Sequence, residues 1–249
     1  MGVFISVIGL CIGSFLNVCI YRIPREESIV FPASHCTGCG YNLKWIDLMP
    51  IVSWLLLKGE CRKCDEKISF KYPLVELING LIYLLLFLKF GLTLNLIFYC
   101  ILASLLIVIS FIDLETKYIY TFTTILGMAI TISYIVVAGY MGNLNILNNI
   151  LGGAIGFIII YIIVIITKSM GEGDAELAGV CGLLLGVNGI FIALFLSIII
   201  AGMTASILLL AKLKDRKSEI AFGPYISIGA VLCLLYGEQA LALYMKLFL

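Results

Sequence analysis

Long apolar runs constrain this chain more than any other feature of its sequence. Of its 249 residues, 62% are hydrophobic, and the mean hydropathy is +1.15. A helical run of about twenty apolar residues can cross the hydrocarbon core of a bilayer, and a helix satisfies its own backbone hydrogen bonds there. The sequence therefore predicts an all-α polytopic membrane protein. About eight transmembrane helices are expected, at residues 2–21, 74–88, 95–113, 118–138, 147–167, 176–188, 190–211 and 222–244.

Two places affect the number of helices. The sixth and seventh predicted helices are separated by only about two residues, at Val187-Asn188-Gly189. A tight helical hairpin explains this short turn, and a single bent segment is the alternative. At the N-terminus, Met1 opens directly into the first apolar run, with no basic region before it and no Ala-x-Ala cleavage site. This pattern predicts a retained helix rather than a cleaved signal peptide.

The basic residues predict the orientation of these helices. Cytosolic loops of membrane proteins are enriched in Lys and Arg. With eight helices and both chain ends outside, only Lys89 and Lys246 of the 16 basic residues fall on the outer side. The cytosolic side then holds Arg22, Arg25, Lys44, Lys58, Arg62, Lys63, Lys67, Lys71, Lys117, Lys168, Lys212, Lys214, Arg216 and Lys217. Because no basic face exists outside these loops, the sequence does not support nucleic-acid binding.

A polar segment at residues 22–73 carries two Cys-x-x-Cys pairs. Cys36 and Cys39 form the first pair, and Cys61 and Cys64 form the second. This spacing is typical of a structural zinc site, and a metal would stabilise a segment too short to build a large core. Disulfides and free thiols are the alternatives, and a cytosolic location disfavours disulfides. We predict tetrathiolate zinc, with His35 as a neighbour of the site.

Two aspartates lie at the predicted cytosolic ends of apolar runs. Asp113 ends the third predicted helix, and Asp174 closes the motif Gly171-Glu172-Gly173-Asp174. A carboxylate in this position is costly to hold, and its default interpretation is functional. Two of them on one membrane face suggest a pair that shares a proton for acid–base chemistry. Helix capping at the membrane interface is the alternative for both residues.

Other catalytic mechanisms lack the residues they need. The single histidine lies beside the cysteine pairs, so a Ser-His or Cys-His nucleophile has no free base. The sequence contains no His-Glu-x-x-His motif, no Gly-x-Gly-x-x-Gly motif and no phosphate-binding loop. An aspartate pair can hydrolyse a peptide when one ionised carboxylate activates water and a protonated one polarises the carbonyl. Gly171 and Gly173 would let the backbone approach an extended peptide closely.

Two other functions could use the same carboxylates. In a non-enzymatic carrier, Asp113, Asp174 and Glu76 would line a proton or cation path, and the cysteine segment would act as a gate. The sequence shows no inverted repeat, which disfavours this function. In a presenilin-like protease, the aspartate pair would cut transmembrane helices in general. Glu76 has a simpler alternative, a carboxylate that reaches the membrane interface.

Several motifs together resemble the type IV prepilin leader peptidase family, whose polytopic members are Gly-x-Gly-Asp aspartyl proteases. The resemblance covers nearly the whole chain, and Asp113 and Asp174 fall where the family places its catalytic aspartates. The stretches similar to the opening signature of the family are Gly13–Val18 and Tyr21–Pro24. Those similar to its cytosolic domain are Ser34–Cys39, Asp47–Trp54, Gly59–Cys64 and Tyr72–Glu76.

This resemblance implies a specific activity. Such enzymes sit in the bacterial inner membrane and cut the basic leaders of prepilins and pseudopilins, which serve type IV pili and protein secretion, after a glycine at the cytosolic face. Members with the cysteine domain typically also N-methylate the new N-terminus with S-adenosylmethionine. Arg22, Glu76 and Glu176 are candidate supporting residues.

The resemblance also implies a domain organisation. Residues 1–21 would form the first helix, 22–73 the zinc-binding, methyltransferase-associated domain, and 74–249 the peptidase domain. Two positions depart from the usual pattern of the family. Glu176 stands where a lysine is usual, and Leu48 replaces an asparagine after Asp47.

Overall fold

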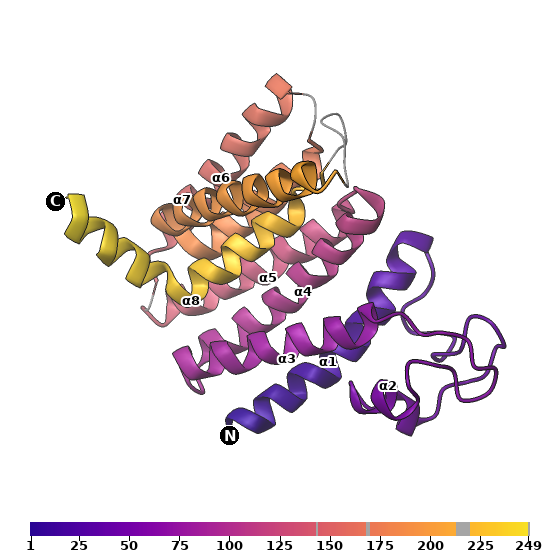
Figure 1. The fold of residues 1–249 in the computed structure, drawn as a ribbon. Helices are drawn as coiled ribbons and strands as arrows, with labels where there is room; N and C mark the ends of the chain where they lie inside the picture. The colour runs from indigo at the N-terminus through magenta and orange to yellow at the C-terminus, as the bar shows by residue number, and fades with distance from the viewer. Residues whose placement is uncertain (143, 168–169, 213–219, 249) are drawn as a thin grey trace. The chain divides into compact units, whose positions relative to one another are not determined.

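The computed structural model describes residues 1–142, 144–167, 170–212 and 220–248, and these are mainly helical, with loops and turns in much of the segment between residues 26 and 70 (Figure 1). The predicted all-α polytopic fold is confirmed. The helices and 3₁₀ turns are α1 Gly2–Arg22, η1 Ile23–Arg25, η2 Trp45–Leu48, α2 Val52–Leu56, α3 Lys71–Phe90, α4 Leu94–Thr116, α5 Thr121–Tyr140, α6 Ile146–Thr167, α7 Glu172–Leu210 and α8 Gly223–Phe248. Four of the predicted cytosolic basic residues, Lys168, Lys214, Arg216 and Lys217, lie outside the described residues.

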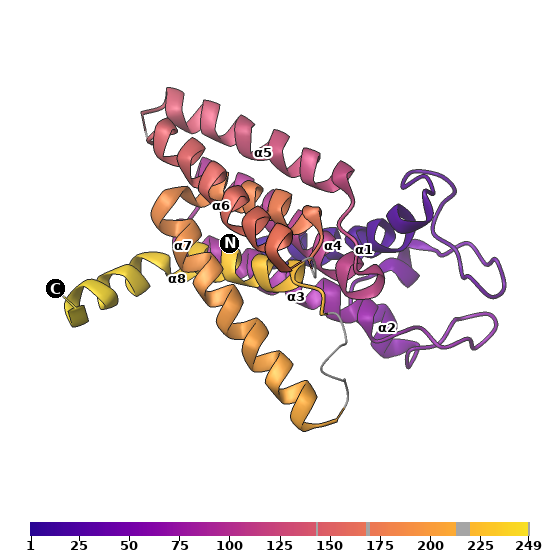
Figure 2. The same cartoon turned by 90° about the horizontal axis from the view of Figure 1, so that it is seen from above.

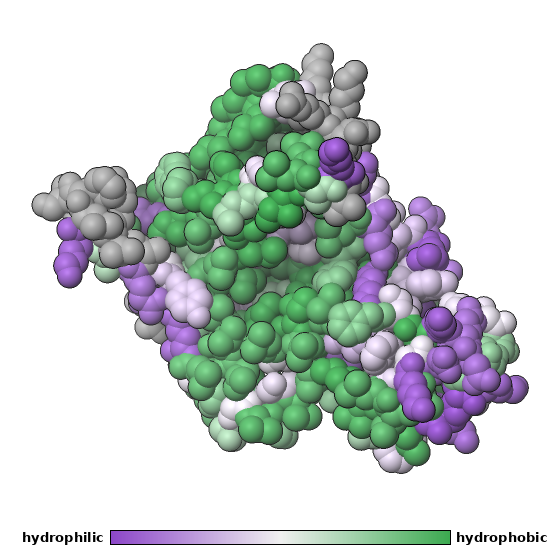
Figure 3. All heavy atoms as spheres, viewed as in Figure 1, coloured by the Kyte–Doolittle hydropathy of each residue, from purple (hydrophilic) through white to green (hydrophobic). Residues whose placement is uncertain are grey.

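Six helices in the described part of the chain are long and apolar enough to cross a membrane: α1, extended by η1, and α3, α4, α5, α6 and α7. Apolar side chains cover much of the visible surface over these helices, and hydrophilic ones gather over the loops near α2 (Figure 3). The ends of these membrane-spanning helices differ from the predicted ends by a few residues. Helix α7 begins at Glu172 rather than at 176, because Gly171 acts as its N-cap and the Asp174 carboxylate accepts the Gly171 N–H.

Helix α7 settles the short turn near residues 187–189 in favour of a hairpin. Its 39 residues contain one non-helical position, Gly186, with φ of 71° and ψ of −177°. A straight helix of that length would span about 58 Å, yet Gly171 before it and Ile220 after it line the same cavity. The two parts of α7 therefore turn back on each other at Gly186, as Figure 2 shows.

Two asparagines stabilise this turn. A break at Gly186 frees helix carbonyls that would cost several kcal/mol if they stayed unpaired in the hydrocarbon region. The Asn149 side-chain amide donates to the carbonyls of Leu183 and Leu184, at 2.8 and 3.1 Å. The Asn148 side-chain oxygen accepts the Val187 N–H at 3.4 Å. These two asparagines, in the first turn of α6, thus stabilise the α7 hairpin.

The chain divides into two compact units, Met1–Val108 and Ile109–Leu249. In the first unit, glycines bring α1 and α3 into close contact: a β-carbon on Gly13 would lie 2.7 Å from the Glu76 Cα atom. The buried Asn79 donates to the Gly9 carbonyl at 2.6 Å and accepts the Ser104 hydroxyl at 2.9 Å. The buried Asn79 side chain thus forms hydrogen bonds with both neighbouring helices, α1 and α4.

In the second unit, α6 packs against the first part of α7. A β-carbon on Gly152 would lie 2.6 Å from the Gly182 carbonyl oxygen, and one on Gly156 would lie 2.5 Å from that of Ala178. Small residues allow membrane helices to approach at backbone distance. The prediction that Gly152, Gly153 and Gly156 serve close helix packing is confirmed.

Candidate active site

The second unit brings Asp113 and Asp174 to one small cavity. The cavity has a volume of about 50 Å³ and is also lined by Lys117, Met170, Gly171, Ile220, Ala221 and Phe222. Asp113 is 4% exposed and Asp174 is 7% exposed. A water molecule needs about 10–15 Å³ of such space, so the cavity has room for a few waters beside the two carboxyl groups. Peptide hydrolysis by an aspartate pair needs these two carboxyl groups and a water molecule, in addition to the peptide.

Backbone N–H groups at helix N-termini hold both carboxylates. Asp113, in the last turn of α4, accepts the Gly223 N–H through Oδ2 at 3.0 Å, at the start of α8. Asp174, at the third position of α7, accepts the Gly171 N–H through Oδ2 at 3.2 Å. The Asp174 Oδ1 atom is buried and has no hydrogen-bond partner in the structure. A buried carboxylate oxygen without a partner is costly, and it is a free acceptor for a reacting group.

The two glycines of the motif differ in their surroundings. A β-carbon on Gly173 would lie 2.7 Å from the Ile119 Cβ atom, so Gly173 lets the start of α7 pack against the connection between α4 and α5. Gly171 has open space around its Cα atom and lines the cavity. Of the two, Gly171 is therefore the one with room for another chain.

Gly223 is a part of this site that sequence reasoning missed. Its N–H binds Asp113, and a β-carbon on it would lie 2.7 Å from Asp113 Oδ2. The only signal in the sequence is the Gly223-Pro224 pair, since proline favours the first turn of a helix. Nothing in that pair points to a partner 110 residues earlier in the chain.

The remaining predicted carboxylates lie apart from this cavity. Glu176, one turn of α7 after Glu172, accepts a short hydrogen bond from the Thr124 hydroxyl of α5. It joins two helices and is not among the residues that line the cavity. Arg22 and Glu76 line a different cavity, in the first unit.

The four predicted metal-binding cysteines converge in the first unit. All four Sγ atoms lie within 4.8 Å of one another, and the Cys36–Cys64 and Cys39–Cys61 pairs are 3.7 and 4.0 Å apart. Tetrahedral zinc with Zn–S bonds of about 2.3 Å requires sulfur atoms about 3.8 Å apart, so the donor set fits that metal. None of the nine cysteines, all of which lie within the described residues, forms a disulfide. His35 is exposed and stands outside the cluster, as predicted.

The two cysteine turns have the same backbone construction. The Cys36 N–H donates to the Tyr41 carbonyl, and the Cys61 N–H donates to the Glu66 carbonyl, at 2.9 and 2.8 Å. Gly40 and Asp65, each one residue after the second cysteine of its pair, both have positive φ, 68° and 57°. The Lys63 N–H, which donates to Cys61 Sγ at 3.4 Å, helps to lower the pKa of the Cys61 thiol to about 7. Metal binding requires the thiolate.

Asp47 connects these turns. Its side chain is 3% exposed and accepts the Arg62 Nε–H at 2.7 Å and the Tyr41 hydroxyl at 3.3 Å. Burial by itself would raise the pKa of Asp47, but the hydrogen bonds from Arg62 and the Lys44 N–H outweigh it and lower that pKa. The ionised carboxylate therefore holds the two cysteine turns together.

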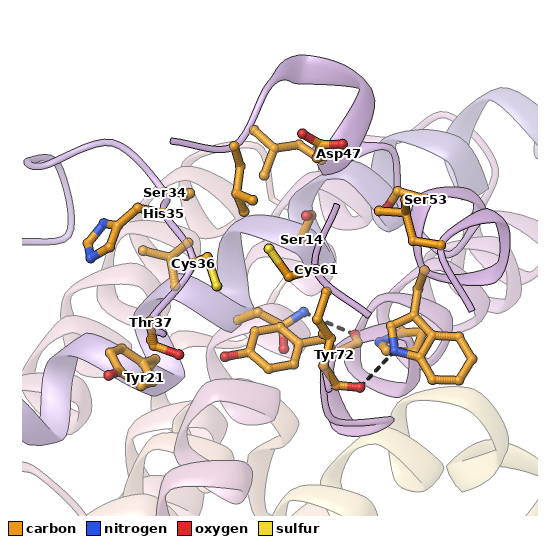
Figure 4. A pocket seen from close by; sticks show the side chains of 18 of the residues that line it. Ser14, Tyr21, Ser34, His35, Cys36, Thr37, Asp47, Ser53, Cys61 and Tyr72 are labelled. Carbon is orange, nitrogen blue, oxygen red and sulfur yellow. Dashed lines mark hydrogen bonds between the residues drawn. The ribbon is translucent and has the colours of Figure 1, made fainter. Parts of the chain in front are cut away.

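The first unit also contains the larger of the two cavities described here. It has a volume of about 320 Å³ and lies between the end of α1, the cysteine segment and the start of α3 (Figure 4). Arg22, buried at the end of α1, donates to the Ser28 and Pro32 carbonyls at 2.8 and 2.7 Å. The buried Glu76 accepts the Ile51 N–H at 2.7 Å. Both residues thus shape the wall of this cavity.

Comparisons with known proteins agree with these features. A model of the bacterial peptidase A24 N-terminal domain matches residues 7–90, and a model of the type IV leader peptidase family matches residues 100–207. No solved structure matches the chain.

Curated relatives carry the name prepilin leader peptidase/N-methyltransferase. One from Bacillus subtilis is 32% identical over 247 residues, covering 97% of this chain and 96% of the relative. One from Xanthomonas campestris is 29% identical, covering 96% and 92%. One from Myxococcus xanthus is 38% identical over 186 residues, which are 72% of this chain but only 55% of that longer protein. With this similarity along almost its whole length, the chain belongs to the type IV leader peptidase family.

Proposed function

We propose that this protein is an aspartyl endopeptidase that removes the leader of prepilins or pseudopilins after a glycine, at the cytosolic face of the bacterial inner membrane. The observation that carries the proposal is the shared cavity of Asp113 and Asp174, with the unpartnered Asp174 Oδ1 atom. The curated relatives are named for the same activity. A second activity, N-methylation of the new N-terminus, follows from the same names.

Peptide hydrolysis at this site needs one ionised and one protonated carboxyl group. The ionised group takes a proton from a water molecule as the water attacks the carbonyl carbon of the scissile peptide bond. The protonated group donates a hydrogen bond to the carbonyl oxygen, and a proton then passes to the leaving amine. The Gly223 and Gly171 N–H groups hold one oxygen of each carboxylate, so the second oxygen of each serves the reaction.

The test is cleavage of a prepilin peptide by purified full-length protein with S-adenosylmethionine, measured by intact-mass spectrometry. Asp113→Asn and Asp174→Asn should each lower the cleavage rate by about a thousandfold or more, because the two groups act as a unit. Glu172→Gln is the matched control: Glu172 is exposed, lies beside Asp174 and does not line the cavity. Normal cleavage by either aspartate variant would exclude the assignment. The product mass also shows where the substrate is cut. A cut at the leader junction supports leader removal, and a cut within the transmembrane helix of the substrate supports a presenilin-like protease.

For methyl transfer, we place the methyl donor in the 320 Å³ cavity of the first unit. Pockets for small molecules usually have volumes of about 300–1,000 Å³. S-adenosylmethionine carries a sulfonium cation, an adenine ring and an amino-acid end. The cavity offers aromatic faces from Tyr21, Trp54 and Tyr72 for the ring and the cation. Its charged lining residues are Glu27, Asp47, Glu66, Glu76, Arg22, Arg62 and Lys67.

Filling this cavity tests the placement separately from the activity. Ser53 lines the cavity, so Ser53→Trp should weaken binding of S-adenosylhomocysteine about tenfold or more in calorimetry and abolish methylation. Cleavage should persist, and Ser53→Ala, which adds no bulk, should keep both activities. Unchanged affinity in Ser53→Trp would move the donor elsewhere. Absence of binding and methylation in the unaltered protein would instead remove the methyltransferase function.

We also propose that the four cysteines hold zinc. The donor set of four thiolates suits zinc, and the metal would stabilise the cysteine turns without taking part in hydrolysis.

A further inference from the structure

Residues 45–56, which comprise η2 and α2, carry an apolar surface although they lie outside the membrane-spanning helices. Trp45 is 75% exposed, Leu55 is 61% exposed and Leu56 is 74% exposed. Ile46, Leu48, Met49 and Val52 are also exposed. Figure 3 shows this apolar surface over α2, next to hydrophilic side chains of the cysteine loops. An exposed apolar surface with a polar border marks an interaction site.

Three contacts fix this segment beside the start of α3. The Ile51 N–H donates to the buried Glu76 carboxylate of α3 at 2.7 Å. The Trp54 indole N–H donates to the Ile68 carbonyl at 3.0 Å, and its ring packs edge-on against Phe70 with centroids 5.7 Å apart. Ile51 also has a φ of 61°, which is rare for a β-branched residue. The segment is therefore held against a membrane helix rather than extended into solvent.

The apolar surface continues into the side of α3 that faces lipid. Phe70, 62% exposed, precedes the exposed residues Leu77, Leu81 and Leu88 by steps of seven, four and seven residues. These spacings place all four on one narrow stripe of the helix. Since α3 crosses the membrane, lipid must cover this stripe, and Phe70 joins it to Trp54 and α2.

We infer that residues 45–56 together with Phe70 form a membrane-docking surface that lies in the headgroup region of the bilayer. Tryptophan favours this region, and the exposed Lys44 and Lys58 flank the segment where they can meet anionic headgroups. Amphipathic segments of this kind bury their apolar face about 5–10 Å into the boundary between headgroups and acyl chains. Leu48, Ser53 and Trp54 also line the 320 Å³ cavity, so docking holds that cavity at the membrane surface.

Both tryptophans of the chain, Trp45 and Trp54, lie in this segment, so tryptophan fluorescence, excited at a wavelength that tyrosine does not absorb, reports on this segment alone. Trp54→Phe leaves Trp45 as the only tryptophan and keeps an aromatic ring against Phe70. The full-length variant is reconstituted in vesicles of phosphatidylcholine and phosphatidylglycerol whose acyl chains are brominated at shallow or deep positions. We expect bromine at the shallow position to lower Trp45 emission about twofold or more. Bromine at the deep position and acrylamide in the water should quench less, because an interfacial segment lies between the two.

Each other result overturns the inference. Strong acrylamide quenching without bromolipid quenching would place Trp45 in water. Protection from both quenchers would mean that protein, such as a second copy, covers the surface.

A second variant tests the apolar side chains themselves. Leu55→Ser/Leu56→Ser should reduce bromolipid quenching severalfold at unchanged helix content by circular dichroism. If Trp54→Phe fails to fold, the unaltered protein and Trp45→Phe give the same comparison.

Discussion

At the scale of single residues, Gly171 and Gly173 are alike in chemistry but differ in what surrounds them. A β-carbon on Gly173 would meet Ile119 at 2.7 Å, whereas Gly171, with φ of −81° and ψ of 154°, has open space. Overpacking of this kind costs about 1–3 kcal/mol and would shift Asp174, the next residue. We therefore expect Gly173→Ala to lower prepilin-peptide cleavage about tenfold or more in rate measurements with purified protein.

Gly171→Ala is the matched control, since its backbone angles suit any residue. It should fold normally and retain measurable cleavage. Equal losses in the two variants, or a larger loss in Gly171→Ala, would mean that the contact with Ile119 does not position Asp174.

At the scale of the elements, the contact between α6 and α7 depends on backbone approach. A β-carbon on Gly182 would lie 2.1 Å from the Gly152 carbonyl oxygen, so the helices would have to separate. Gly182→Ala should lower the free energy of unfolding by about 1–3 kcal/mol. The measurement is the thermal unfolding midpoint in detergent, which should fall. Gly202→Ala, in the second part of α7 where nothing lies within 4 Å of the added carbon, should leave the midpoint unchanged. A similar loss in both variants would assign the effect to helix α7 itself.

The cysteine segment is the other element with a direct test. We expect about one zinc ion per chain by metal analysis of the purified protein, because four thiolates complete a tetrahedral site. Replacing Cys36, Cys39, Cys61 and Cys64 by serine should abolish it. Asp47→Asn removes the charge that pairs with Arg62 across the two turns, and it should make zinc easier to extract with a chelator. Unchanged zinc content in the four-serine variant would remove the tetrathiolate assignment.

At the scale of the whole molecule, the hairpin in α7 decides the orientation of the chain ends. With two crossings in α7 and one in α8, where the sequence predicts a helix at residues 222–244, the chain crosses the membrane eight times, and both ends lie on one side. The basic residues predict that this side is outside. An alkaline phosphatase fused after Leu249 should therefore be active, and one fused after Lys67 should be inactive. Activity of only the second fusion, or of both, would contradict this orientation.

The sequence by itself determined the helical membrane class, the cysteine cluster and the position of the two aspartates at helix ends. These properties follow from local signals: the length of apolar runs, the spacing of Cys36, Cys39, Cys61 and Cys64, and the Gly-x-Gly-Asp motif. Bilayer thickness and metal geometry act on such short stretches in the same way in any fold. The sequence left the α7 turn open between a hairpin and a bend.

Only the tertiary structure decided which backbone groups meet the functional side chains. The Gly223 N–H reaches Asp113 across 110 residues, Asn149 pairs the carbonyls freed near Gly186, and Ile119 distinguishes Gly173 from Gly171. The apolar surface of residues 45–56 likewise became visible only when Trp54 was seen against Phe70. Such contacts join distant segments through side chains and backbone groups, and no periodic or local pattern in the sequence encodes them.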